Sequence, residues 1–464
     1  MYPYALGMRL SRVSLLAAVI TLVAAASAPA AAPPTRVVTM DGYAAPGTPP
    51  ELNKVKVIQI GQARAKRVLV LVPGTSAGGS YFAPLARDLV RRLPGWQVWA
   101  IERRENLLED QTALRQAKAG KLNPQGLFDY YLGWLNNPAI TTHFVPKTDA
   151  ETGYARQWGM NVAVNDIRVV IQAAKRGGRK VTLGGHSLGG SIIDAYATWD
   201  FNGKAGGDDL NGLVFIDGGT APGTALTPEA AQGYLDTLAT SSPFLDLTGL
   251  GLPWSAGVFN AVGSNSALID PKGPAILGSW PLLPDNLKTP VPATTEAAYG
   301  YALDVKTGPQ SLALVQSHIG HLAESGDPRG WVNDGLTTAL RAARVFGAPD
   351  FPDMDGTAWY HPRRLTIDAG AVNGGAANPA QAVLDVHAIH GASLKTPIYA
   401  FATSLGGERV VKAALALAKQ AGIPPSKVVT VDASATDAHI DPISDLPGKN
   451  KFLKTVVPFL KTLR

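Results

Sequence analysis

Short apolar runs recur along the chain and predict buried β-strands. They lie at residues 54–60, 67–72, 96–101, 180–183, 212–216, 397–402 and 427–431. Between several of these runs, apolar residues recur three or four positions apart, as along one face of a helix; Leu85, Leu89 and Leu93 are an example. Such helical patterns cover 82–93, 161–175, 191–197, 408–421 and 450–463. Strands that alternate with helices predict an α/β fold with a mostly parallel, doubly wound sheet.

Three stretches depart from this alternation. Residues 31–50 are rich in Ala, Pro and Thr and are expected to be a leader into the fold, and residues 106–159 look irregular. From about 221 to 394 the alternation breaks down into Pro- and Gly-rich pieces that contain four of the tryptophans. We interpret this segment as an insertion. The predicted organisation is an α/β core at 31–222 and 391–464 with a cap or lid insertion at 223–390.

The N-terminus has the layout of a secretory signal peptide. Arg9 and Arg12 precede an apolar run at 13–26, and the small residues Ala28-Pro-Ala30 follow it. We therefore assign 1–30 to a signal peptide and expect a secreted protein, extracellular or periplasmic. No second stretch of about 18 apolar residues follows, so we expect no membrane span in the mature chain.

Composition excludes several classes of protein. In a chain of 464 residues, 46% are hydrophobic and 17% are charged, which allows a sizeable core and excludes intrinsic disorder. The absence of cysteine excludes disulfides, thiolate metal sites and a cysteine nucleophile. The net charge of +6, without any Lys/Arg tract, indicates a solvated surface rather than a nucleic-acid partner. No motif implies a cofactor, and His318 and His321, without carboxylate or cysteine ligands nearby, do not predict a metal site.

The candidate chemistry centres on Gly185-His-Ser187-Leu-Gly189, which directly follows the strand predicted at 180–183. A serine at a sharp turn from strand to helix needs flanking residues without side chains, and it is typically a nucleophile. A chain with 49 glycines can also produce this pattern by chance as an ordinary turn. The strand before it and the helical pattern after it favour a nucleophilic Ser187.

A serine hydroxyl needs a base within hydrogen-bond reach. Of the eight histidines, His439 alone follows the last predicted strand, in a loop that can lie over the strand ends. His186 is inside the turn itself, where its side chain is not expected to reach Ser187. The other histidines are expected to be surface or packing residues: His143, His318, His321, His361, His387 and His390. We therefore predict His439 as the base.

Two acids remain open as the partner of His439. Asp217 ends the strand at 212–216, at the carboxyl edge of the sheet where this fold class gathers ligands, although it could also cap its own loop. Glu408 follows the strand at 397–402, but a glutamate in the first turn of a helix is favoured by the helix dipole alone. Asp437 and Asp441 are too close in sequence to His439 to be first choices. We favour Asp217 and keep Glu408 as the alternative.

Stabilising a developing oxyanion requires two backbone N–H groups. One is expected from Leu188, after the nucleophile. The other is expected from the Gly-rich loop after the strand at 67–72, where Gly74 and Thr75 occupy the turn. We predict Thr75 as the second donor.

At these residues the chain resembles the α/β-hydrolase superfamily, in particular its lipase- and esterase-like members. The resemblance covers about 54–222 and 397–464. It implies that Pro73-Gly74-Thr75 is the oxyanion loop, where many relatives have His-Gly, that Ser187 is the nucleophile and that His439 is the histidine. Asp217 corresponds to the acid of a subset of the superfamily; the commoner position, after a later strand, has no Gly-x-x-Asp in this chain.

The resemblance also implies a reaction. Dehalogenases and epoxide hydrolases of this fold use an aspartate where this chain has Ser187, which argues against those chemistries. We expect a secreted serine hydrolase that cleaves small-molecule or lipid-like carboxylic esters through an acyl-enzyme, without a cofactor. The alternatives are an acyltransferase or a peptidase with the same triad, or a non-catalytic secreted binding protein of this fold.

Overall fold

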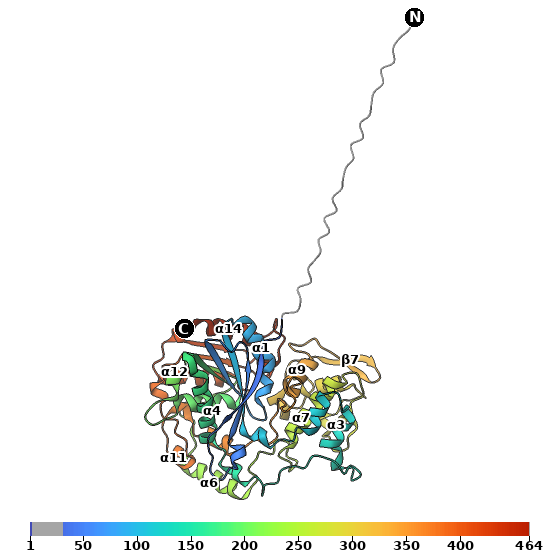
Figure 1. Ribbon diagram of the computed structural model, residues 1–464, viewed down its shortest axis with the longest axis horizontal. Coiled ribbons are helices and arrows are strands. Elements are labelled where there is room, and N and C mark those ends of the chain that lie inside the picture. Colours follow the sequence, from blue (N-terminus) through green and yellow to red (C-terminus); the bar gives the residue numbers. More distant parts are fainter. Residues whose placement is uncertain (2–30, 464) are drawn as a thin grey trace. The chain divides into compact units, whose positions relative to one another are not determined.

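An eight-stranded sheet forms the centre of the part of the chain that the computed structural model describes, which is residue 1 and residues 31–463 (Figure 1). The strand order across the sheet is β1-β2-β4-β3-β5-β6-β9-β10. The strands are β1 (Thr35–Asp41), β2 (Lys54–Ile60), β3 (Arg67–Val72), β4 (Trp96–Glu102), β5 (Lys180–His186), β6 (Gly212–Ile216), β9 (Ile398–Ala402) and β10 (Val428–Asp432). All neighbouring pairs from β4 to β10 are parallel, whereas β1 and β2 pair antiparallel. The prediction of a mostly parallel sheet is therefore confirmed.

Helices cover both faces of this sheet. Successive side chains of a strand point to opposite faces, so Leu69 and Leu71 belong to one buried cluster while Val68 and Val70 belong to the other. The first cluster includes residues of α1 (Ala83–Arg92) and α14 (Lys451–Thr462). The second cluster includes residues of α4 (Met160–Lys175), α5 (Leu188–Thr198) and α12 (Glu408–Gln420). The sheet is thus doubly wound, as the sequence predicts.

A third hydrophobic cluster lies outside these two and is rich in aromatic rings. It joins α2 (Thr112–Lys118) and α3 (Pro124–Tyr131) to α7 (Ser255–Ile269), which lies next to α3 in Figure 1. The Phe144 ring packs edge-on against Trp254, at 5.3 Å between centroids, and against Trp359, at 5.4 Å. Such contacts hold a part of the predicted insertion firmly against the segment before α4.

The rest of the predicted insertion packs against the sheet clusters. Residues of α8 (Thr295–Leu303) and α9 (Ala339–Gly347) belong to the first cluster, and residues of α10 (Arg363–Ala369) and α11 (Ala380–Leu384) to the second. The remaining α-helices and strands of the described residues are α6 (Pro228–Thr240), the antiparallel pair β7 (His321–Gly326) and β8 (Arg329–Val332), and α13 (Asp441–Ser444). The described residues from 33 to 463 belong to one compact unit. The boundaries between core and cap at 222/223 and 390/391 stay a prediction.

The sequence misassigned two stretches. The expected leader at 31–50 contains β1, a strand at the edge of the sheet whose residues are mostly exposed. An edge strand buries little, so its sequence lacks the apolar run that marks the inner strands. The stretch at 106–159 contains α2 and α3, each of at most eight residues, too short for a clear helical periodicity.

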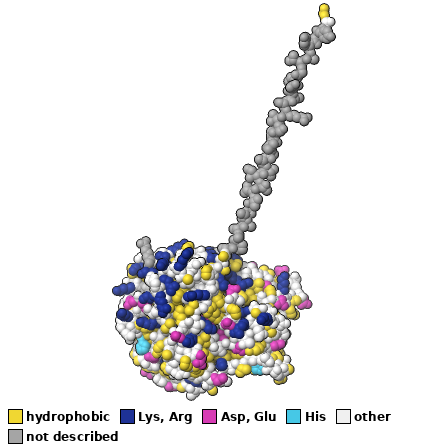
Figure 2. All heavy atoms as spheres, in the orientation of Figure 1, with side chains coloured by type: hydrophobic (Ala, Val, Ile, Leu, Met, Phe, Trp, Pro, Cys, Tyr) yellow, Lys and Arg dark blue, Asp and Glu magenta, His cyan; other side chains and the backbone are white. Residues whose placement is uncertain are grey.

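The predicted signal peptide at 1–30 lies outside the described residues, apart from Met1. None of the helices within the described residues has the length and apolarity needed to cross a membrane. Figure 2 shows Lys and Arg side chains spread among acidic and apolar ones over the face in view.

Candidate active site

Ser187 occupies a tight turn between β5 and α5. Its backbone lies at φ 56° and ψ −127°, and its N–H donates to the Ile216 carbonyl at 2.9 Å. A Cβ at Gly185 would lie 2.1 Å from the Gly189 carbonyl oxygen, and a Cβ at Gly189 would lie 2.2 Å from that of Val72. Both positions therefore require glycine, and the strained turn leaves the Ser187 side chain partly exposed at the carboxyl edge of the sheet.

His439 and Asp217 meet beside this turn, although 222 residues separate them in the chain. The His439 Nδ1 atom lies 2.5 Å from Asp217 Oδ2, and the two side chains are 2% and 0% exposed. Asp217 also accepts hydrogen bonds from the Thr403 N–H at 2.7 Å, from the Thr403 hydroxyl and from the Gly406 N–H at 3.2 Å. Burial alone would raise the pKa of Asp217, but the hydrogen bond and charge of His439 lower it to about 2. The carboxylate is therefore ionised at neutral pH.

This pairing determines which nitrogen of His439 can react. Since Nδ1 is bonded to an ionised carboxylate, its N–H donates to that carboxylate, which leaves Nε2 as the nitrogen that can take a proton. An imidazole in this tautomer can take the proton of a serine hydroxyl.

Glu408, the alternative acid, lies elsewhere. It is the first residue of α12, its side chain is 70% exposed, and its carboxylate is paired with Lys412 at 2.6 Å. The structure thus brings Asp217, and not Glu408, into contact with His439.

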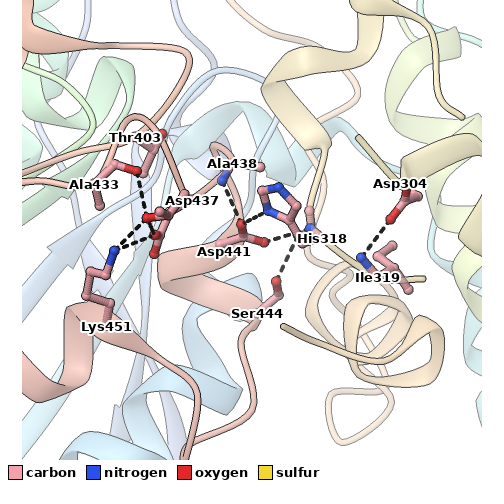
Figure 3. Close-up of polar contacts among 12 residues, drawn as sticks. Asp304, His318, Ile319, Thr403, Ala433, Asp437, Ala438, Asp441, Ser444 and Lys451 are labelled. Atoms are coloured by element: carbon pink, nitrogen blue, oxygen red, sulfur yellow. Dashed lines mark hydrogen bonds and ion pairs between the residues drawn. The ribbon is translucent and has the colours of Figure 1, made fainter. Parts of the chain in front are cut away.

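Asp441 and Asp437 hold the loop that contains His439 (Figure 3). The Asp441 carboxylate accepts the Ala438 N–H at 2.6 Å and the His318 backbone N–H at 2.9 Å. It also bonds His318 Nδ1 at 2.6 Å, which raises the pKa of that imidazole. Asp437 pairs with Lys451 at 3.2 Å. The two aspartates therefore fasten the loop on both sides of His439.

His186 links three loops of the site through a chain of hydrogen bonds. Its Nε2 lies 2.9 Å from the carbonyl oxygen of His439, and its Nδ1 lies 3.0 Å from the hydroxyl of Tyr81, which accepts the Gly74 N–H. Burial and the neighbouring His439 lower the pKa of His186 to about 3, so the ring is neutral. A carbonyl only accepts, so Nε2 has the proton, Nδ1 accepts from Tyr81, and the tautomer is determined.

The loop after β3 approaches Ser187 closely. A Cβ at Gly74 would lie 2.7 Å from the Cβ of Ser187. The buried Arg103 guanidinium donates to the carbonyl of Pro73 at 2.7 Å and to that of Gly74 at 3.0 and 3.1 Å. In a trans peptide the C=O and the following N–H point in opposite directions, so Arg103 turns the Thr75 N–H away from itself. Leu188, the other predicted donor, is the first residue of α5, where backbone N–H groups lack partners within the helix.

Sequence reasoning missed Arg103, Tyr81 and Thr403. Arg103 directly follows β4, and Thr403 directly follows β9. Both therefore lie at the carboxyl edge of the sheet, where functional residues of this fold class gather, and their position after a predicted strand could have identified them. Tyr81 lies in a short 3-10 helix, Gly79–Phe82, and nothing in the local pattern distinguishes it from a packing residue.

The remaining histidines lie outside this constellation. His361 is buried with Nε2 3.3 Å from the Thr366 hydroxyl, and His143 stacks on Trp134 at 4.4 Å. His321 and His387 are exposed, and His390 bonds Asp200 at 2.9 Å. In the described part of the chain, no three His, Asp or Glu side chains gather as a metal ion would require.

The chain was compared with protein families, curated proteins and solved structures. No model of a protein family and no curated protein matches the sequence. Among solved structures, the chain is similar to epoxide hydrolase A from Mycobacterium thermoresistibile, with 13% identity, a TM-score of 0.44, and coverage of 93% of this chain and 99% of that one. It is also similar to the monoacylglycerol lipase of Paleococcus ferrophilus, with 12% identity, a TM-score of 0.39, and coverage of 88% and 99%. A thermophilic esterase from Thermogutta terrifontis matches with 12% identity, a TM-score of 0.37, and coverage of 92% and 99%.

The fold itself is defined by the strand order and the turn at Ser187. An antiparallel β2 beside a parallel sheet, with a Gly-x-Ser-x-Gly turn after β5, is the architecture of the α/β-hydrolases. The chain has the α/β-hydrolase fold, as the resemblance implied. At identities this low, the reaction has to be argued from the site.

Proposed function

We propose that the protein is an exported serine hydrolase that cleaves carboxylic esters through an acyl-enzyme. The observation on which this rests is the contact of His439 Nδ1 with Asp217 at 2.5 Å, beside a serine in a strained turn. A neutral imidazole oriented by an ionised carboxylate is what a serine hydroxyl needs to become a nucleophile.

In the proposed reaction, the Ser187 hydroxyl oxygen attacks the ester carbonyl carbon while His439 Nε2 takes the hydroxyl proton. The Asp217 carboxylate stabilises the imidazolium that forms. The N–H groups of Leu188 and Thr75 bind the oxyanion of the tetrahedral intermediate. His439 then gives its proton to the leaving alcohol, and the carbon–oxygen bond to that alcohol breaks.

The second half of the reaction repeats these steps with water. His439 takes a proton from a water molecule as its oxygen attacks the acyl carbon of the Ser187 ester. The intermediate collapses, the bond to Ser187 breaks, and the proton returns to the serine oxygen. The products are an alcohol and a carboxylic acid, and the enzyme is restored.

The test combines active-site labelling with ester hydrolysis. A fluorophosphonate probe is expected to label the protein once, at Ser187, and p-nitrophenyl esters are expected to be hydrolysed. Ser187→Ala should lose both the labelling and the hydrolysis, because the oxyanion donors that remain cannot replace the nucleophile. Ser191→Ala, a serine one turn further along α5, is the matched control and should keep both. A folded wild-type protein that neither reacts with the probe nor hydrolyses any ester would overturn the proposal.

The proposal of export rests on the sequence pattern around Arg9, Arg12 and Ala30. Protein recovered outside the cytoplasm is expected to begin shortly after residue 30, which N-terminal sequencing measures. An intact N-terminus on protein that stays in the cytoplasm would contradict export and leave the proposed reaction untouched.

A further inference from the structure

A cavity of about 320 Å³ lies within the predicted cap. Its walls are α7, α8, the 3-10 helix Gln310–Val315 and the segment at 275–289. Its volume falls at the lower end of the range of about 300–1,000 Å³ that is usual for ligand sites. Leu247 and Leu250 line it and are 37% and 47% exposed, so the cavity opens to solvent there.

Two helices present whole faces to this cavity. On α7, most of the lining residues recur three or four positions apart, and the full set is Ala256, Phe259, Asn260, Val262, Gly263 and Ser266. On α8 they follow the same spacing: Thr295, Ala298, Tyr299, Ala302 and Leu303. All fifteen residues of α7 are uncharged, and its other face packs in the third cluster. A helix without charged residues can be covered on both sides, and here one side faces the third cluster and the other faces the cavity.

The walls of the cavity combine apolar side chains with neutral polar ones. None of the residues around the cavity, all within the described part of the chain, has a charged side chain. Two of its polar side chains pair with each other, because the Tyr299 hydroxyl donates to Asn260 Oδ1 at 2.8 Å. A charged group placed there would lose its hydration without gaining a partner, which is costly. The cavity therefore suits an uncharged, apolar ligand.

The walls are fastened to both loops of the candidate active site. Ser76 lines the cavity and follows Thr75, the predicted oxyanion donor. On the other side, Val315 lines the cavity, and the carbonyl of the next residue, Gln316, accepts the Ile440 N–H at 3.1 Å, beside His439. One wall of the cavity thus adjoins the loop that approaches Ser187 and another is bonded to the loop that contains His439, although neither Ser187 nor His439 itself lines the cavity.

We propose that this cavity, which we call the acyl cavity, binds the acyl chain of the ester. The substrate class is an ester of an unbranched aliphatic carboxylic acid of medium or greater length. This inference rests on the proposed serine hydrolase. It adds that α7 and α8 select the acyl group by burying its methylenes.

The first test is a series of p-nitrophenyl esters from acetate to octanoate, each rate divided by the spontaneous rate of the same ester. Burying a methylene is worth about a fourfold gain in kcat/KM at most, since about 0.8 kcal/mol is gained for each. We expect kcat/KM to rise at least about a hundredfold from acetate to octanoate. Ser187-dependent hydrolysis with equal values for both esters would overturn the acyl cavity and leave the proposed reaction intact.

The second test fills the cavity. Ala298→Trp on α8 and Gly278→Phe place a large side chain in it; a Cβ at Gly278 would meet no heavy atom within 4 Å. Each is expected to lower the ratio of octanoate to acetate kcat/KM at least tenfold. Ala230→Trp, on the exposed side of α6, is the control and should leave the ratio unchanged. An unchanged ratio in both cavity variants would overturn the inference.

Binding separates the cavity from catalysis. Methyl octanoate is expected to bind Ser187→Ala, measured by calorimetry, and binding should be lost when Ala298→Trp is added. Binding without hydrolysis by the wild type would refute the proposed reaction and keep the cavity. Hydrolysis without binding to Ser187→Ala would refute the cavity alone.

Discussion

The replacement of Asp217 by Asn is the sharpest test of the site. The two carboxylate oxygens have different partners: Oδ1 accepts the Thr403 N–H, whereas Oδ2 accepts the Thr403 hydroxyl and faces His439 Nδ1; the Gly406 N–H lies 3.2 Å from both. In an asparagine, the amide oxygen has to face the Thr403 N–H, so the NH₂ group takes the place of Oδ2, donates to the Thr403 hydroxyl and points at His439. Nδ1 then has to accept, and the imidazole proton moves to Nε2.

An imidazole in that tautomer cannot take the proton of Ser187. We therefore expect Asp217→Asn to lower kcat by at least about a hundredfold, and towards about ten-thousandfold if the tautomer switch is complete. Glu408→Gln is the matched control, because the Glu408 side chain is 70% exposed and its carboxylate is paired with Lys412. It should retain nearly the full rate.

The assay is hydrolysis of a p-nitrophenyl ester near pH 8, with thermal unfolding of each variant to show that it is folded. Activity of Asp217→Asn within threefold of the wild type would refute the assignment of the acid. So would a hundredfold loss in Glu408→Gln.

Three further predictions concern the surroundings of the site. Arg103→Lys keeps a positive charge beside Glu105 but cannot reproduce the three hydrogen bonds of the planar guanidinium to the Pro73 and Gly74 carbonyls. In this variant kcat should fall at least about tenfold with little change in KM. Values of kcat and KM equal to those of the wild type would contradict this role for Arg103. Tyr81→Phe leaves the Gly74 N–H and His186 Nδ1 without a partner, so urea unfolding should show a loss of about 1–3 kcal/mol; an unchanged midpoint would refute the hydrogen-bond chain. Burial, and then the neighbouring Asp355, raise the pKa of Glu102 to about 8, above its value in the unfolded chain. Its contribution to stability is therefore fully present below about pH 4.5 and is lost as the pH rises towards 8, by at most about 1.4 kcal/mol per pH unit. The difference in unfolding free energy between wild type and Glu102→Gln should shift in this direction across that range, and a difference independent of pH would show that the raised pKa is wrong.

Local patterns made most of the fold predictable. The inner strands and the helices beside them bury one or both faces, so their apolar residues follow the period of the element, and the predicted elements match within a few residues. The edge strand β1 was not predicted because it buries too few residues to show an apolar period, and the helices α2 and α3 were not predicted because they are too short to show one. Local signals also located Ser187, since the glycines of its turn are adjacent to it in sequence.

The partner of His439 could not be chosen in this way. Asp217 and Glu408 each follow a strand of the same sheet, and both are plausible from sequence. The choice depends on the direction of two side chains that are far apart in the chain. Asp217 has a positive φ of 48° and turns inward onto His439, whereas Glu408 begins a helix and points to solvent.

The sequence by itself therefore determined the α/β alternation, the strained serine turn and the strand ends where reactive groups gather, because each depends on neighbours within about a helical turn. The tertiary structure alone decided which acid contacts His439 and how Arg103 and His186 hold the surrounding loops. It also decided that α7 and α8 line an uncharged cavity next to the loop that approaches Ser187. These features arise where distant segments pack together, and packing is set by the whole fold rather than by any local pattern.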